Sequence, residues 1–332
     1  MKATNLYRFL FASTLCGFLF TACKKSSSSS NGTSQTELQT QADDESRVSS
    51  ETDASFNDVN TAMEGSATIT GSSQDRTVRY GVTVDGGNQD TVKNSLVCNA
   101  MVTFDTTDNP HTITITYNGK TSDSLRIRTG SIVISWVPGT HWTTAGDQIT
   151  VTFQNLKIVR VLDNKAILFN GTHTYTNVTG GSLLSLTSNT ATPITHTITS
   201  SNMSITFDDG SQRTWSFARQ RTYSYNNGFK IQETGTHSSG GMNDISEWGT
   251  NRFGNSFTAQ ITTPLTAQVC NNSLQVTAGV YVLTNNSGVF TLTFGLDVNG
   301  NPVSGCSLTN VYYLQLVWAG AGGKTYSITL PY

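Results

Sequence analysis

Apolar and polar residues alternate with period two through most of the chain after residue 65. Ile113, Ile115 and Tyr117 are separated by threonines, and this segment runs into Asn118-Gly119. Such alternation predicts half-buried strands, and Asn-Gly favours a tight hairpin turn. No stretch with helical spacing separates the strands, so βαβ units are excluded. Residues 65–332 therefore predict a body of antiparallel, hairpin-linked strands.

Further strands are expected wherever the same alternation returns between polar turns. They cover residues 125–136, 148–161, 166–178, 198–207, 213–225, 229–236, 255–263, 274–283, 289–294, 311–318 and 324–330. Their outward positions carry threonine and asparagine more often than leucine and aromatics, which favours sheets wetted on one side over an outer-membrane barrel. We expect an all-β fold with large antiparallel meander sheets, sandwich-like or strongly curved, that could divide into two sub-sheets near residues 180–195.

One segment near the start has a helical pattern instead. Residues 43–45 are acidic, which suits the start of a helix, and Gly65 suits its end. The apolar residues between them recur at near-helical spacing. They are Val48, Phe56, Val59 and Met63. Residues 43–64 therefore predict an amphipathic helix packed on the sheet.

The first 22 residues form a separate unit. A basic start at Lys2 and Arg8 is followed by an apolar run over residues 9–20, and Ala22 precedes Cys23. The run is shorter than the roughly 20 residues that a membrane-spanning helix needs. This segment resembles the signal peptide of a bacterial lipoprotein, although an ordinary secretory signal also ends in small residues. The resemblance implies cleavage before Cys23 and acylation of its thiol and new amino group.

The resemblance also implies where the protein goes. Lipoproteins that stay in the inner membrane commonly carry Asp after the cysteine, whereas Lys24 and Lys25 follow Cys23 here. We therefore expect attachment to the outer membrane by lipid, with the face undecided. Residues 23–42 are rich in serine and other polar residues and predict a flexible tether between the lipid and the body.

Composition narrows the function. Only 13% of residues are charged and the formal net charge is −2, which argues against nucleic acid as a partner because that partner requires a basic surface. After Cys23 the remaining cysteines are Cys98, Cys270 and Cys306, so at most one disulfide forms within the body. Cys98 shares a predicted strand face with apolar residues and is interpreted as a core residue. Cys270 and Cys306 lie in turn-like surroundings, where a disulfide would join the last strands.

Several motifs resemble those of uncharacterised bacterial lipoproteins with a type II signal peptide and a large all-β domain. Residues 128–134 match R-x-G-x-I-x-I, residues 151–155 match V-T-F-x-N, and residues 171–174 match G-T-x-T. At the end of the chain, residues 323–330 match G-K-T-Y-x-I-x-L. Residues 296–304 depart from the pattern as an added hairpin loop. No activity is established for the group, so the resemblance brings none.

Catalytic and metal-binding motifs are weak or missing in the sequence. There is no G-x-S-x-G, and the five histidines are scattered singly. His173 is in phase with apolar residues and is interpreted as a satisfied, partly buried side chain. Glu233, Asp244 and Glu247 are the best acidic cluster for a glycosidase, but solvated loop carboxylates are the commoner case. We predict no catalytic residue, no metal and no cofactor.

Other signals concern binding. Residues 215–225 place aromatic rings and two arginines on one strand face, as a ligand-binding stripe or a buried ladder would. Asp297 begins a sequence like a calcium loop, for which a hairpin turn is the simpler explanation. His141, Trp142 and Trp248 fall in predicted loops, where exposed aromatics can grip sugars. The sequence thus favours a non-catalytic envelope lipoprotein with a structural or partner-binding role. The alternative is a carbohydrate-binding or carbohydrate-active surface lipoprotein.

Overall fold

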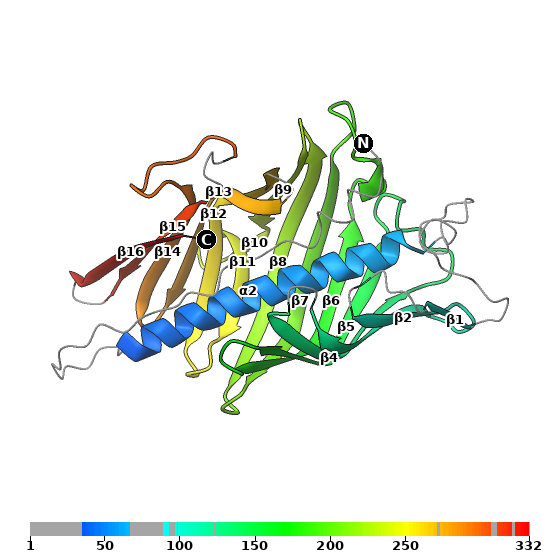
Figure 1. Ribbon diagram of the computed structural model, residues 1–332, viewed down its shortest axis with the longest axis horizontal. Helices are drawn as coiled ribbons and strands as arrows, with labels where there is room; N and C mark the ends of the chain where they lie inside the picture. Colours follow the sequence, from blue (N-terminus) through cyan, green and yellow to red (C-terminus); the bar gives the residue numbers. More distant parts are fainter. Residues whose placement is uncertain are drawn as a thin grey trace.

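The computed structural model describes most of the chain from the predicted helix to its end. The described residues are 35–66, 89–92, 97, 99–121, 124–270, 273–306, 311–320 and 323–331. Within them a single helix of 30 residues, α2 (Gln35–Glu64), lies across one face of a large antiparallel sheet (Figure 1). The expected all-β fold with one N-terminal helix is confirmed.

The described strands join into one sixteen-stranded sheet. They are β1 (Gln89–Val92), β2 (Ala100–Asp105), β3 (His111–Lys120), β4 (Arg126–Trp136), β5 (Gln148–Arg160), β6 (Ala166–Asn177), β7 (Ile194–Phe207), β8 (Gln212–Tyr225), β9 (Phe229–Gly235), β10 (His237–Ser239), β11 (Met242–Thr250), β12 (Ser256–Cys270), β13 (Ser273–Asn285), β14 (Gly288–Leu296), β15 (Tyr313–Ala319) and β16 (Thr325–Pro331). Strands β1 to β8 follow one another as a meander, and so do β11 to β16.

The two meanders meet at the long strand β8. Its first half pairs with β11 and its second half pairs with β9, which also pairs with β12. The sheet does not divide near residues 180–195, because β6 and β7 pair directly on either side of that segment. The segment itself contains only a short 3-10 helix, η2 (Leu183–Ser185). The predicted division into two sub-sheets is therefore wrong: the intervening residues make a connection, and the strand ladder continues past it.

Apolar residues with period two place one face of the sheet in the core. On β3 the buried members are Ile113, Ile115 and Tyr117, and β4 and β5 repeat the pattern. Phe56 and Met63 of α2 are completely buried in the same cluster. Burying a side chain of this size contributes about 1.5–3 kcal/mol, so the core binds helix and sheet together.

The opposite face of the same strands is lined by hydroxyl groups. Cross-strand partners from β3 to β7 form one row of threonine and serine. The row is Thr112, Ser135, Thr150, Thr174 and Thr199. These side chains keep part of their surface in solvent, as expected of a sheet wetted on one side.

The helix begins earlier than its pattern indicates. It starts at Gln35, so residues 35–42 of the predicted tether are helical. Gln35, Glu37 and Leu38 favour helix more than the serines before them. The predicted helix over residues 43–64 is otherwise confirmed, and it ends before Gly65 as expected. Residues 23–34 of the predicted tether lie outside the described residues.

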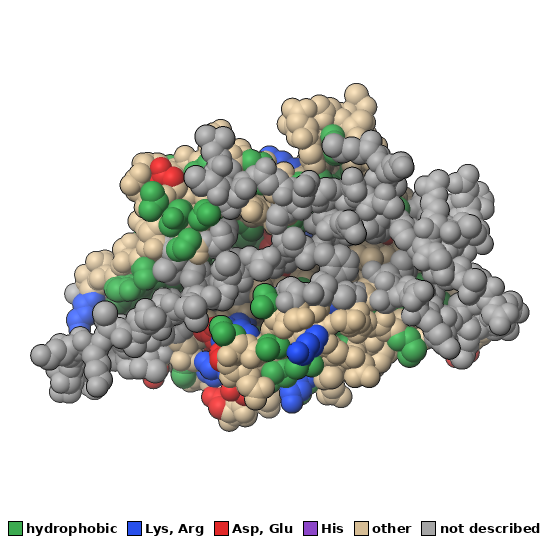
Figure 2. Space-filling model, in the orientation of Figure 1, with side chains coloured by type: hydrophobic (Ala, Val, Ile, Leu, Met, Phe, Trp, Pro, Cys, Tyr) green, Lys and Arg blue, Asp and Glu red, His purple; other side chains and the backbone are tan. Residues whose placement is uncertain are grey.

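Charged side chains on the visible face gather along one long edge of the molecule, at the bottom of Figure 2. Half of the acidic residues of α2 belong to a different environment. Asp44, Glu51, Asp58 and Glu64 are each no more than 6% exposed. Carboxylates this deeply buried require partners, and these partners define the candidate site.

Candidate functional site

Six acidic residues of α2 pair with arginines, five of them on strands of the sheet and one in the turn between β11 and β12. Asp58 lies 2.6 Å from Nη1 of Arg128, and Asp44 lies 2.6 Å from Nη2 of Arg252. Four more pairs follow the same rule, with arginines of β4, β5 and β8. They are Asp43 with Arg160, Glu45 with Arg213, Glu51 with Arg126, and Asp53 with Arg221. The helix is therefore docked by charge as well as by its apolar side chains.

Two buried glutamates of the sheet complete the network. Glu247 of β11 pairs with Arg219 and lies 3.4 Å from Arg213, and it accepts a hydrogen bond of 2.6 Å from Nε1 of Trp215. Glu233 of β9 binds Arg221 and lies 3.1 Å from Arg219. Both glutamates thus act as counter-ions inside the sheet. The prediction that they are solvated loop carboxylates is wrong, because β9 and β11 bring them against the inward-facing arginines of β8.

Several of these arginines also lie over aromatic rings. The guanidinium carbon of Arg221 is 4.7 Å from the ring centroid of Phe56, and that of Arg213 is 4.3 Å from Phe257. Arg128 lies 4.4 Å from the ring of Tyr117. A planar, weakly hydrated guanidinium suits this combination of a carboxylate partner and an aromatic face. The contact of Arg221 with Phe56 adds a cation–π attraction between β8 and α2.

Burial shifts the protonation of the helix carboxyls. Burial raises the pKa of Asp44 to about 6 although Arg252 opposes the shift, and it raises the pKa of Glu45 to about 7 against Arg213. Glu233 behaves in the opposite way. Burial would raise the pKa of Glu233, but Arg221 and Arg219 together hold it below the ordinary value. The helix side of the interface is therefore sensitive to pH near neutrality.

Two histidines lie buried on the same face without hydrogen-bond partners among the described residues. His173 is fully buried, and its ring centroid lies 4.6 Å from both Phe153 and Phe217. His196 lies 4.9 Å from the ring of Trp142. Burial lowers the pKa of each imidazole to about 3. The prediction of a satisfied, partly buried His173 is wrong, because the strand phase turns its ring against Phe153 and Phe217, which offer no acceptor or donor.

The predicted sugar-binding loop residues have different neighbours. His141 is exposed, but Trp142 is 1% exposed and belongs to the core. Trp248 is half-buried on β11, where its ring stacks on His237 with 4.2 Å between centroids. Trp142 is therefore a packing residue, and the structure does not place these three residues in one cleft.

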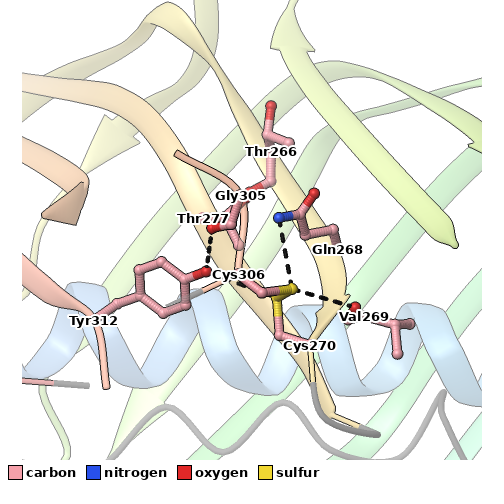
Figure 3. Close-up of a disulfide and its surroundings, with 8 residues drawn as sticks. All are labelled: Thr266, Gln268, Val269, Cys270, Thr277, Gly305, Cys306 and Tyr312. Carbon is pink, nitrogen blue, oxygen red and sulfur yellow. Dashed lines mark hydrogen bonds between the residues drawn. A yellow bond between two sulfur atoms is a disulfide. The ribbon is translucent and has the colours of Figure 1, made fainter. Parts of the chain in front are cut away.

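The two cysteines for which the sequence suggested a disulfide are bonded in the structure. Cys270 and Cys306 form a disulfide with 5.4 Å between their Cα atoms, and their sulfurs are joined in Figure 3. Beside it, the hydroxyl of Tyr312 donates a hydrogen bond of 2.5 Å to the carbonyl of Gly305. The disulfide ties the segment between β14 and β15 to the end of β12. Cys23 and Cys98 lie outside the described residues, so the lipid attachment and the core placement stay predictions.

Other weak signals are structural. Asp297 accepts hydrogen bonds from the backbone N–H groups of Asn299 and Asn301, as a residue that closes a turn does. On one face of β8 the aromatics and the two paired arginines are all buried from residue 215 to residue 223, as in a buried ladder. Asp244, the third member of the acidic cluster, is exposed.

The sequence did not reveal the ion pairs between the helix and the sheet. Its signal was present, because Arg128 and Arg213 stand in phase with buried residues of their strands. An arginine at an inward position needs a counter-ion, and the acidic helix was the source within the same chain. Which carboxylate meets which arginine could not be seen from spacing.

Within the described part of the chain, no three histidine, cysteine, aspartate or glutamate side chains come together as a metal site. No described helix is long and apolar enough to cross a membrane. No protein-family model, no curated protein and no solved structure matches the chain. The resemblance to bacterial lipoproteins therefore stays a prediction from the motifs.

Proposed function

We propose that this protein is a lipid-anchored lipoprotein of the cell envelope, attached to the outer membrane through Cys23, with a non-catalytic, structural or partner-binding role. The observation that supports it is the use of buried charge in the described residues. Glu233 and Glu247 neutralise arginines of the sheet, and the carboxylates of α2 fasten the helix. These groups hold a scaffold together.

The position of α2 relative to Cys23 agrees with this role. Residues 24–34 separate Cys23 from the first residue of α2. Eleven residues span at most about 40 Å when fully extended. A lipid on Cys23 would therefore keep the sheet close to the membrane surface, where it could meet other envelope components.

The carbohydrate alternative gains no support from the residues that suggested it. Trp142 is buried in the core, and Trp248 is already stacked on His237. An aromatic platform for sugar needs exposed rings that converge on one cleft. The partner-binding role therefore fits these residues better than the carbohydrate-binding role.

The proposal is tested by replacing the acylated cysteine. We expect the native protein to sediment with outer membranes and to have an acylated cysteine as its first residue by mass spectrometry. Cys23→Ala should move the protein to the soluble fraction, while Cys98→Ser, a matched change of another thiol, should leave it on the membrane. An amino terminus upstream of residue 23, or equal sedimentation of both variants, would show that the proposed anchor is wrong.

A further inference from the structure

The sheet face beneath α2 holds buried polar groups that have no hydrogen-bond partner among the described residues. The ring of Phe56 lies 5.6 Å from that of His173 and 5.5 Å from that of Tyr175. Neither nitrogen of His173 has a hydrogen-bond partner among the described residues, and neither does the hydroxyl of Tyr175. The Nε–H groups of Arg213 and Arg219 also have no hydrogen-bond acceptor among the described residues. Buried donors without acceptors are rare in a finished core, so this face has the capacity to bind more than α2 supplies.

The helix that occupies this face is itself polar. Its buried positions include Gln41, Thr52, Ser55, Asn60 and Thr61. The hydroxyl of Thr52 bonds the carbonyl of Val48, and that of Ser55 bonds the carbonyl of Glu51, so they serve the helix and not the sheet. Among its buried positions, polar residues outnumber the apolar residues, which are Val48, Phe56, Val59, Ala62 and Met63. Its attachment depends on a few apolar side chains and on the ion pairs.

Those ion pairs contribute less than their number suggests. Burying a carboxylate and a guanidinium requires the loss of hydration of both, and their attraction roughly offsets that loss. Separation of α2 from the sheet rehydrates both partners at once. The attachment is therefore reversible, and salt weakens it where the pairs reach solvent. Asp53, whose side chain is 38% exposed beside Arg221, is such a point.

From this combination we infer that the arginine-bearing face beneath α2 is a docking surface for an acidic helix of a partner protein, with α2 as its intramolecular occupant. Charge complementarity identifies the occupant, since the face already holds one acidic helix through six carboxylate–arginine pairs. The inference deepens the partner-binding part of the proposed function. It does not depend on the lipid.

The structure also specifies what the partner helix must carry. Glu45, Asp53 and Asp58 contact arginines at two strands of the sheet, β8 and β4. They are spaced by eight and five residues in the sequence, and Phe56 stands between the last two as the aromatic that contacts Arg221. A competing helix needs carboxylates at comparable spacing and one aromatic residue among them.

The test uses the intact mature protein and a labelled synthetic peptide of residues 35–64. We expect the peptide to bind, with an affinity that falls as salt rises. Asp53→Asn in the protein should weaken the intramolecular helix alone, so the peptide should bind about fivefold more tightly, because a larger fraction of the protein is open. Asp105→Asn, which removes a carboxylate that accepts hydrogen bonds from Thr107, should leave the affinity unchanged.

Two further arms decide the outcome. A peptide with Glu45→Gln, Asp53→Asn and Asp58→Asn should not bind. Hydrogen exchange followed by mass spectrometry should show the amides of α2 opening before those of β3 to β8, and faster in Asp53→Asn. Exchange of α2 only together with the sheet, or independent opening without peptide binding to either protein, would overturn the inference.

Vesicles of phosphatidylethanolamine and phosphatidylglycerol form the last comparison. If they accelerate exchange of α2 while the peptide does not, the face binds anionic lipid and the inference of a helical partner is wrong. Each of these measurements compares proteins that carry the same amino terminus, so the lipid on Cys23 does not decide the result. The anchor and the docking surface can therefore fail separately.

Discussion

Asp58 of α2 and Arg128 of β4 form an ion pair in the protein interior, with 2.6 Å between Oδ2 and Nη1 and side chains only 5% and 7% exposed. The hydroxyl of Tyr117 donates a hydrogen bond of 2.8 Å to the same carboxylate oxygen. Burial raises the pKa of Asp58 against the effect of Arg128. One carboxylate thus holds a cation and a phenol from two neighbouring strands.

Replacement of Asp58 by Ala should destabilise the protein strongly. Loss of one partner of a buried pair typically costs about 3–5 kcal/mol, which chemical denaturation would measure. Asp163→Asn is the matched control, because Asp163 pairs with Arg160 at a side-chain exposure of 31%, and such pairs contribute at most about 1 kcal/mol. The double variant Asp58→Leu with Arg128→Met should recover most of the loss. Equal effects of the two single changes would contradict a dominant role for burial.

Replacement of His173 by Phe should remove an acid sensitivity. The pKa of His173 is about 3 in the folded protein and its ordinary value is 6.5. Below pH 6.5 the unfolded chain therefore binds a proton at His173 that the folded protein does not bind. Stability then falls by up to about 1.4 kcal/mol per pH unit. The variant should therefore gain about 2 kcal/mol relative to the native protein between pH 7 and pH 5. Phe153→Leu, which alters the same aromatic cluster without a titrating group, should show a constant difference.

Replacement of Glu45 by Gln should have the opposite pH dependence. The folded carboxyl has a pKa of about 7 and the ordinary value is 4.5, so the folded protein binds a proton that the unfolded chain lacks. The native carboxyl therefore stabilises the fold increasingly as the pH falls from 7 to 4.5. Relative to the native protein, the variant should be less stable at pH 5 than at pH 8, by about 2.5 kcal/mol. A constant difference at both values would mean that Arg213 keeps Glu45 charged.

Removal of the disulfide should loosen the last strands. Cys270 and Cys306 are 36 residues apart, and closing a loop of this length stabilises a protein by about 4 kcal/mol in the chain-entropy account. The variant Cys270→Ser with Cys306→Ser should lose stability of that order in urea unfolding. Hydrogen exchange should increase first in β12 and in residues 296–306. Faster exchange confined to β3 to β6 would contradict the assignment of the bond as a local clamp.

Much of the fold could be predicted from local pattern. Ile113, Ile115 and Tyr117 alternate with threonine, and the structure buries all three, since a strand directs successive side chains to opposite faces. The end of the helix before Gly65 could also be predicted. The early start at Gln35 was not, because polar residues with good helix propensity look the same in a tether.

The candidate site was less predictable, and Glu233 and Glu247 show why. Both were noticed as acidic residues close in sequence, and both were interpreted as solvated. Their burial depends on Arg219, which lies 14 and 28 residues away in the chain. A carboxylate next to turn residues gives no local sign that an arginine of another strand will cover it.

The sequence by itself determined the strand periodicity, the helix that ends before Gly65 and the pair of cysteines able to meet, because these depend on residues near one another or on residue types that are few. Only the tertiary structure decided that the acidic helix lies on the sheet's arginines. Asp44 and Arg252 are 208 residues apart and touch only when the whole sheet has formed. Charges attract through space without regard to sequence, so their pairing emerges with the fold.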